Sequence, residues 1–85
     1  MTLSDLPNIG VEIERQLHAV EIHSVEELRA VGAEQAWLRI LAMDTSACMN
    51  RLLALEGAVQ SVKKTLLPPK RKAELREFYQ SHKSS

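Results

Sequence analysis

A small number of strong helix breakers divides the sequence into short segments, and this division limits the chain to one class of fold. Pro7 and Gly10 interrupt the N-terminal region, Gly32 lies further along, and Pro68 and Pro69 precede the last segment. Between these breakers apolar residues recur at spacings of three and four, whereas no useful stretch alternates with period two. The sequence therefore predicts no strands and an all-α fold, a compact bundle of about five short helices.

The bounds of these helices follow from periodicity and from proline. We expect a short turn or helix over residues 2–6, because Pro7 disfavours helical geometry in the residue before it. Three helices follow over about residues 11–20, 24–31 and 33–42, each with an apolar face. A fifth helix begins at Pro69, since the first turn of a helix needs no N–H from that residue. We expect it to dock through Leu75, Phe78 and Tyr79. The longest helix lies between the third and the fifth, and its predicted apolar stripe is Cys48, Leu52, Leu55, Val59 and Val62.

Polar residues mark where individual helices start. Ser24 and Glu27 have the spacing of a capping box, in which each side chain accepts a hydrogen bond from the other residue's backbone N–H. Asp44, Thr45 and Ser46 are expected to cap the longest helix. Gly57 lies inside that helix, where it costs about 1 kcal/mol relative to alanine, so we expect a neighbouring helix to cross closely there.

Length and composition place the chain in a simple class. Eighty-five residues suffice for one small core, and we expect a single domain over residues 1–80 with a flexible tail over 81–85. The lone Cys48 cannot form an intramolecular disulfide, and no segment resembles a secretory signal. No apolar run approaches the roughly 18 residues of a membrane-spanning helix. We therefore expect a cytoplasmic protein without a membrane partner.

The segment Leu6-Pro7-Asn8-Ile9-Gly10 entering a helix has the pattern of a helix-hairpin-helix turn. In such a turn the backbone N–H groups of Asn8, Ile9 and Gly10 could hold a phosphate without reading bases. The competing interpretation is structural, with Ile9 in the core and Gly10 required by the backbone conformation. Glu12 follows at once and would repel a phosphate at the helix N-terminus. The turn is thus a candidate nucleic-acid contact that the sequence leaves open.

Charge is distributed unevenly along the chain. Residues 1–58 carry a net charge of −5 and residues 59–85 carry +5, although the total is zero. The basic cluster could neutralise phosphates of nucleic acid, attract an acidic protein, or draw two copies together head to tail; as a charge run it could equally be a solvated surface. No aromatic residue interleaves it for base stacking. The candidate nucleic-acid-binding residues of this cluster are Lys63, Lys64, Lys70, Arg71, Lys72 and Arg76.

Catalytic or metal-binding residues are not evident. His18 and His23 lie five positions apart, which is not the four-residue spacing that places two imidazoles on one helix face for a metal ion. Cys48 is expected on an apolar helix face, where a buried thiol behaves as a small hydrophobe. A chain of this size also has little volume for a substrate pocket. We therefore predict no enzyme, no metal or cofactor site and no small-molecule substrate.

Four ordered segments closely resemble the C-terminal domain of the TfoX (Sxy) competence-regulator family, over about residues 3–76. The resemblance implies a helical fold of the helix-hairpin-helix or SAM-like kind and an association with transcriptional regulation of DNA uptake in bacteria. Glu21 departs from the family pattern, since a glycine commonly ends the first helix there. Val62-Lys63-Lys64 also replaces an aromatic-containing segment. The segments are Leu6-Pro7-Asn8-Ile9-Gly10, Ile22-His23-Ser24-Val25-Glu26-Glu27-Leu28, Gly32-Ala33-Glu34-Gln35-Ala36-Trp37 and Leu53-Ala54-Leu55-Glu56-Gly57-Ala58.

Two functional hypotheses remain after this reading. The first is a non-enzymatic interaction module, a regulatory accessory that binds a protein partner or forms a homodimer. The alternative is weak, sequence-nonspecific DNA binding through the turn at Gly10 and the basic cluster. Helical scaffolds of this kind serve both roles, so the fold alone cannot separate them.

Overall fold

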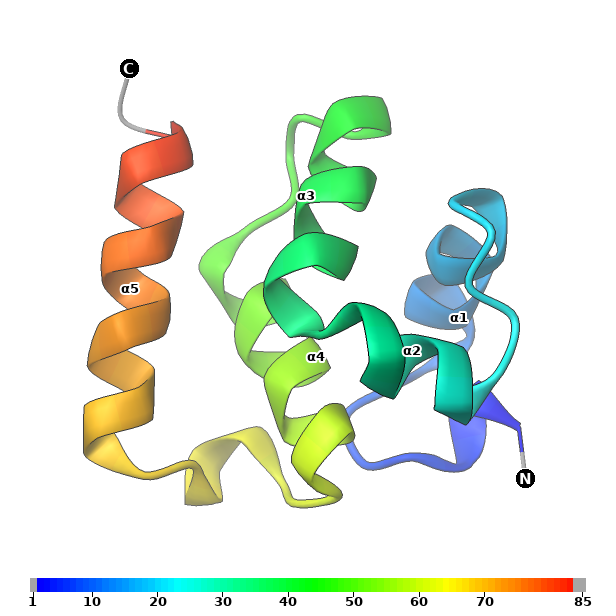
Figure 1. Cartoon of the computed structure of the whole chain (residues 1–85), viewed down its shortest axis with the longest axis horizontal. Helices are drawn as coiled ribbons and strands as arrows, with labels where there is room; N and C mark the ends of the chain where they lie inside the picture. The colour runs from blue at the N-terminus through cyan, green and yellow to red at the C-terminus, as the bar shows by residue number, and fades with distance from the viewer. Residues whose placement is uncertain (1, 84–85) are drawn as a thin grey trace.

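The computed structural model describes residues 2–83 and contains only helices within that range. The all-α prediction is therefore confirmed for the part of the chain described. A short 3₁₀ turn precedes the first helix and another joins α4 to α5 (Figure 1). In chain order the elements are η1 (Leu3–Asp5), α1 (Val11–Ala19), α2 (Val25–Val31), α3 (Ala33–Met43), α4 (Met49–Gln60), η2 (Lys64–Leu66) and α5 (Pro69–Lys83).

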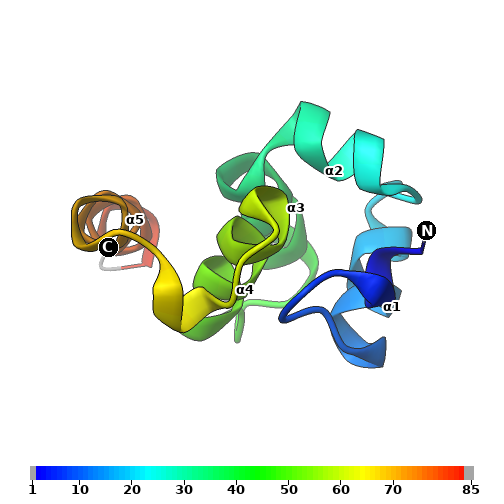
Figure 2. The same ribbon diagram turned by 90° about the horizontal axis from the view of Figure 1, so that it is seen from below.

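Helix α4 occupies the middle of the molecule, and the other helices surround it. It packs most extensively against α3 and also contacts α2, α5 and η2. Helix α1 lies on one side of α4, whereas η2 and α5 lie on the other, as both ribbon views show (Figures 1 and 2). None of the described helices combines the length and the apolar character that a bilayer crossing requires.

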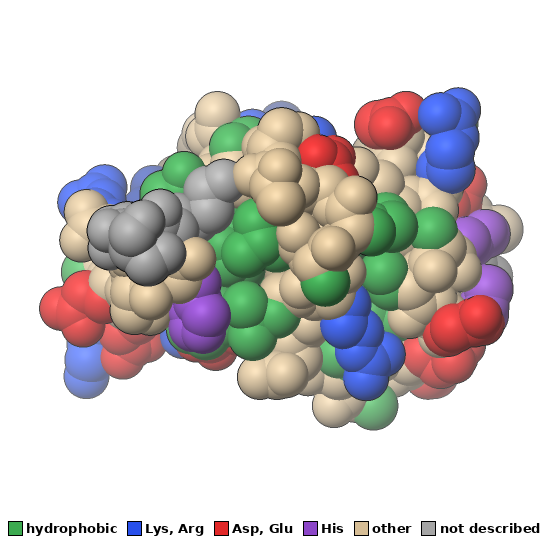
Figure 3. Space-filling view, turned by 90° about the horizontal axis from the view of Figure 1, so that it is seen from above, with side chains coloured by type: hydrophobic (Ala, Val, Ile, Leu, Met, Phe, Trp, Pro, Cys, Tyr) green, Lys and Arg blue, Asp and Glu red, His purple; other side chains and the backbone are tan. Residues whose placement is uncertain are grey.

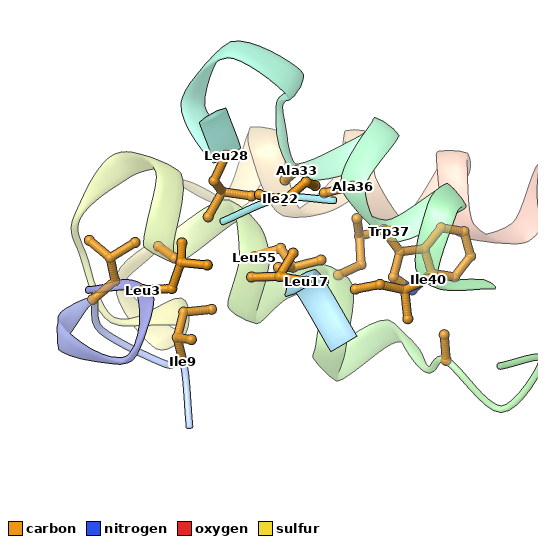
Figure 4. Close-up of a cluster of buried hydrophobic side chains, with 14 of the residues drawn as sticks. Leu3, Ile9, Leu17, Ile22, Leu28, Ala33, Ala36, Trp37, Ile40 and Leu55 are labelled. Carbon is orange, nitrogen blue, oxygen red and sulfur yellow. The ribbon is translucent and has the colours of Figure 1, made fainter. Parts of the chain in front are cut away.

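The core joins side chains from every part of the chain. Leu17 of α1 and Leu55 of α4 lie next to each other at its centre, with Leu3 and Ile9 toward one end and Trp37 toward the other (Figure 4). All five are at most 5% exposed. Burying a large aliphatic or aromatic side chain contributes about 1.5–3 kcal/mol, so a core of this kind can hold a small helical chain together.

The segment between η1 and α1 makes a tight turn. The N–H of Ile9 donates to the carbonyl of Leu6 over 3.3 Å, and Asn8 has a φ of +71°. Proline at the second position and a residue with positive φ at the third are features of a type II turn, for which asparagine is one of the few suitable side chains. The predicted interruption of the helix at Pro7 is confirmed, while its classification as a helix-hairpin-helix turn stays a prediction.

Gly10 does not have the conformational role that the sequence suggested. Its φ is −94°, which any residue can adopt, and a Cβ built on it would meet no atom within 4 Å. The left-handed position of this turn belongs to Asn8 instead. The structural argument for Gly10 is therefore wrong, because Asn8 and not Gly10 takes the positive φ that the turn needs.

Two helices end with a non-glycine residue in the left-handed conformation. Glu21 has a φ of +66° after α1, and Ser61 has a φ of +59° after α4. In α1 the N–H of Ile22 donates to Leu17 O over 2.8 Å and that of Glu21 donates to His18 O over 3.1 Å. This is the Schellman arrangement, which usually places glycine at the left-handed position. The strain anticipated at Glu21 is present at that φ.

The predicted start of α2 is confirmed in part. The hydroxyl of Ser24 accepts from the N–H of Glu27 over 3.1 Å, as a capping box requires. The carboxylate of Glu27, however, accepts from the N–H of His23 rather than from the cap residue itself. Gly32 then ends α2 with a φ of +86°, as its type predicted, and also begins α3.

The start of α4 differs from the prediction. Its N-cap is Cys48, which is exposed, and no side chain caps the helix. Asp44 instead ends α3, and its carboxylate accepts hydrogen bonds from Ser46, Gln16 and Arg51. The expectation of a buried Cys48 is therefore wrong, because the connection after α3 is longer than expected and moves the thiol off the apolar stripe.

Helix α5 docks through the residues that the sequence indicated. Leu75 is fully buried, and the rings of Phe78 and Tyr79 pack against Trp37 with centroid separations of 6.1 and 5.6 Å. Seen from above, hydrophobic surface is visible between α5 and the rest of the molecule (Figure 3). The helix runs through Lys83, so residues 81–83 of the predicted tail are helical, and residues 84 and 85 lie outside the described range.

Candidate functional site

The side chain of Asn8 is engaged within the protein. Its amide nitrogen donates to the carbonyl of Val62 over 2.9 Å, and its amide oxygen accepts from the N–H of Lys64 over 3.0 Å. Both bonds join the Pro7–Gly10 turn to the connection between α4 and η2. Ile9 is 5% exposed and belongs to the core, while Gly10 is exposed. Of the three candidate residues in this turn, only Gly10 is exposed.

Gly57 of α4 makes this contact possible. A Cβ at that position would lie 2.7 Å from Val62 O and 3.2 Å from Lys64 N, and it would also collide with Asn8 Nδ2. The predicted close approach at Gly57 is confirmed, but a loop and an asparagine side chain make it rather than a crossing helix. The sequence placed the glycine inside a helix and gave no sign that Asn8, nearly fifty residues earlier, is what packs there.

Arg71 of the basic cluster is held by three carboxylates. Its guanidinium lies 3.0 Å from both Glu34 and Glu56 and 3.3 Å from Glu74. The hydrogen bond to Glu56 raises the pKa of Arg71 further above its usual value despite partial burial, with a smaller contribution from Glu34. Arg71 therefore ties α5 to α3 and α4 and has little capacity left for a phosphate.

Glu56 is the charged residue that the sequence did not single out. It is only 6% exposed, and its carboxylate accepts from Arg71 and from the side chain of Gln60. Burial alone raises the pKa of this carboxyl, but the hydrogen bonds from Arg71 and Gln60 outweigh burial and hold the pKa below its usual range. Its position beside Gly57 on a largely apolar helix could have suggested a buried ion pair, although not the partner.

The remaining basic residues fall into two groups, one at η2 and one along α5. Lys63 and Lys64 adjoin η2, and the ammonium of Lys72 donates to the carbonyl of Thr65 in the same turn over 3.2 Å. Lys70 and Arg76 are exposed along α5. In the view from above, side chains of both signs are scattered around the edge of the molecule, without a basic patch on that face (Figure 3).

A hollow of about 240 Å³ lies beside the Pro7–Gly10 turn, between α1, α4 and η2. Helix α4 contributes three of its residues and its N-cap residue, α1 two, the turn one and η2 one. The hollow thus combines cationic, amide and apolar groups with one carboxylate. Sequence reasoning had singled out only Asn8 and Lys64 as members of a site, since the other residues share no motif. The lining residues are Asn8, Glu12, Ile13, Cys48, Asn50, Arg51, Ala54 and Lys64.

The two histidines of the N-terminal half lie together at the end of α1. The ring centroids of His18 and His23 are 5.1 Å apart, and His23 Nε2 lies 3.1 Å from a carboxylate oxygen of Glu21. Within residues 2–83 no group of three or more His, Cys, Asp or Glu side chains is arranged to hold a metal ion. The pair is an exposed surface feature.

Comparison with known proteins places this geometry in a family. Residues 1–79 match the family model of the TfoX C-terminal domain. Protein Sxy of Escherichia coli (strain K12) is 37% identical over 79 residues, which cover 93% of this chain and 38% of that protein. The chain therefore spans less than two fifths of the length of this relative.

Two crystal structures of Listeria monocytogenes proteins have the same fold. One, of an uncharacterized protein, shares 46% identity at a TM-score of 0.95 and covers 95% of this chain and 92% of that chain. The other, of a protein of unknown function, shares 47% identity at a TM-score of 0.91 and covers 93% and 96%. By its family match and by this identity to Sxy, the chain belongs to the TfoX C-terminal domain family.

Proposed function

We propose that this chain is a non-catalytic protein-interaction domain that serves a competence-type transcriptional regulator. Family membership supports the regulatory context, because the chain aligns with the domain of that name and with protein Sxy. The observation that carries the binding role is the hollow beside η2, which combines cationic and apolar groups at the surface. At about 240 Å³ it is smaller than the roughly 300–1,000 Å³ typical of small-molecule pockets and suits a side chain of a partner protein.

Nucleic-acid binding is the alternative, and the basic groups near η2 are what favour it. Three observations weigh against it. The side chain of Asn8 is bonded to Val62 and Lys64, the guanidinium of Arg71 is surrounded by carboxylates, and Glu12 lies where a phosphate at the α1 N-terminus would approach. A phosphate backbone needs several free cations in a row, and each one engaged internally weakens that interaction.

Fluorescence anisotropy of labelled duplex and single-stranded DNA, titrated with the full chain at two salt concentrations, tests the choice between these two functions. The interaction-domain proposal predicts no salt-sensitive binding. A steep loss of affinity with added salt would instead establish phosphate neutralisation and support the DNA alternative.

A chimera tests the regulatory context. The segment of Escherichia coli Sxy that aligns with this chain is replaced by residues 1–79 of the chain, and expression of a competence-gene reporter is measured. We expect the chimera to retain a substantial part of the reporter signal, whereas deletion of the segment should lower it. A chimera no better than the deletion would contradict the proposal. Light scattering across a concentration series then measures the molar mass and shows whether the partner is a second copy of the chain.

A further inference from the structure

We infer that the hollow and the adjoining η2 turn bind an acidic, leucine-rich segment of a partner protein. This inference rests on the proposed function and specifies its surface and the chemistry of its ligand. The surface, called here the η2 surface, consists of Arg51, Lys63, Lys64, Leu66 and Lys72 together with the hollow.

The cations of this surface converge on one short turn. Lys63 and Lys64 start η2, and the ammonium of Lys72 reaches back from α5 to the carbonyl of Thr65 over 3.2 Å. Arg51 reaches the hollow from α4 with its side chain 21% exposed, and one of its nitrogens donates to Asp44. Neither Lys63 nor Lys64 makes a side-chain ion pair among the described residues. A carboxylate arriving here therefore meets several positive charges that lack an anionic partner.

Apolar groups lie within the same surface. Leu66 is the last residue of η2 and is 69% exposed, so its side chain is available to an apolar group of a partner. Ile13 and Ala54 line the hollow between α1 and α4. A partner with alternating acidic and aliphatic side chains could cover Leu66 and place one aliphatic side chain against Ile13.

The same features favour a peptide over nucleic acid. A phosphate backbone gains nothing from Leu66, and the carboxylate of Glu12 in the hollow repels it. A peptide carries backbone N–H groups that can donate hydrogen bonds to the carboxylate of Glu12. The acidic side chains of the peptide can all lie on the side that faces the lysines. Charge complementarity of this kind speeds encounter and selects the partner more than it adds affinity.

The test uses the ¹⁵N-labelled full chain and a synthetic peptide of mixed glutamate and leucine, followed by amide chemical shifts. A matched peptide with lysine at every glutamate position is the ligand control. We expect saturable shifts at Lys63, Lys64, Leu66, Arg51 and Ile13 with the acidic peptide and none with the basic one.

Two variants and a matched control locate the site. Lys64→Glu should weaken binding of the acidic peptide at least about tenfold, which corresponds to about 1.4 kcal/mol, and Leu66→Ser should weaken it without changing charge. Arg39→Glu makes the same charge reversal on the exposed face of α3, outside the hollow, and should change affinity less than about twofold. The side chain of Lys64 takes part in no ion pair of the described part of the chain, and the amide spectrum of the variant checks its fold.

Any of the following outcomes would overturn the inference. Shifts confined to another surface, equal effects of Lys64→Glu and Arg39→Glu, or tighter binding of duplex DNA at the same residues would each exclude an acidic peptide site here. Shifts of these residues with protein concentration alone would assign the surface to a second copy. Failure of the acidic peptide without DNA binding overturns this ligand chemistry alone and leaves the hollow to a partner of other chemistry, whereas DNA binding in the anisotropy titration removes both proposals.

Discussion

The side-chain amide nitrogen of Asn8 donates to the carbonyl oxygen of Val62 over 2.9 Å and so joins the first turn of the chain to the end of α4. The same side chain accepts from the N–H of Lys64, so both of its polar ends are used. Gly57 leaves the space that this contact needs. The turn before α1, the C-terminus of α4 and the start of η2 are therefore one connected unit, and the η2 surface is built on it.

Replacing Asn8 with alanine should destabilise the fold by about 2–3 kcal/mol. Two hydrogen bonds are lost, which leaves a partly buried backbone carbonyl and N–H without partners, and alanine is unfavourable at a φ of +71°. Urea unfolding followed by the fluorescence of Trp37 measures the change. Asn8→Gly is the matched control: it removes the same bonds but tolerates the φ, so it should cost about 1 kcal/mol less. Equal losses in the two variants would contradict the role of the conformation.

Gly57→Ala should cost about 2 kcal/mol or more, although alanine is the better helix former. The added methyl group would press on Val62 O and Lys64 N, which are backbone atoms, and on Asn8. Gly10→Ala is the comparison, because a Cβ there meets nothing within 4 Å. That variant should change the free energy of unfolding by less than about 1 kcal/mol, since only the cap preference of glycine is lost. Thermal unfolding by circular dichroism measures both, and a stabilised Gly57→Ala would refute the close contact.

Glu21→Gly is expected to stabilise the protein by about 0.5–1 kcal/mol. Glu21 is exposed and has a φ of +66°. This conformation costs an L-residue about 1–2 kcal/mol and costs glycine nothing. Part of that gain is offset by the greater freedom of glycine in the unfolded chain. The midpoint of urea unfolding should rise for this variant. Glu21→Ala keeps the unfavourable φ and serves as the control, so an equal rise there would point to the lost charge instead.

Stability should fall as the pH is lowered through the acid range, and Glu56 should account for part of the fall. Its pKa lies below the usual value in the folded state, so its contribution is present above the ordinary glutamate pKa of about 4.3 and is lost as the pH drops through the folded value. Glu56→Gln should cost about 1–3 kcal/mol at neutral pH by leaving Arg71 with two of its three carboxylates.

The pH dependence also separates this ion pair from the others. The difference in unfolding free energy between wild type and Glu56→Gln should shrink as the pH falls below the ordinary glutamate pKa and through the lower folded value, because the wild-type carboxyl then becomes protonated as well. Urea titrations at a series of pH values measure that difference. A difference that stays constant across the acid range would show that the loss in the variant is one of packing rather than charge.

Cys48 should react with a thiol reagent in the native state. It is exposed at the N-cap of α4, whereas the apolar stripe of the sequence had placed it in the core. Alkylation by iodoacetamide, followed by mass spectrometry, should proceed at a rate that hardly changes when urea is added below the unfolding transition. Alkylation of Cys48 only upon unfolding would show that the thiol is buried in the native state. Cys48→Ser should not lower stability and should raise it by up to about 1 kcal/mol, because Cys48 is exposed at the N-cap of α4 and serine is a favoured N-cap residue.

The local structure could be predicted from the sequence because its causes are local. Proline at positions 7 and 69, glycine at position 32 and a helical apolar period set where helices begin and end, and they do so through backbone geometry that each residue carries with it. The docking of α5 through Leu75 and the two aromatic residues beside Trp37 followed from the same period. The unusual helix end at Glu21 was indicated by the family resemblance, since a glycine commonly stands there, and not by the local sequence.

Only the tertiary structure decided which residues are free to bind. Nothing local distinguishes Arg71, which is surrounded by Glu34, Glu56 and Glu74, from Lys64, which makes no ion pair within residues 2–83. Asn8 meets Val62 across 54 positions, and the hollow gathers side chains from separate helices. Such contacts depend on how the helices pack against one another. The packing energy that fixes them comes from the whole core and not from any one segment of the sequence.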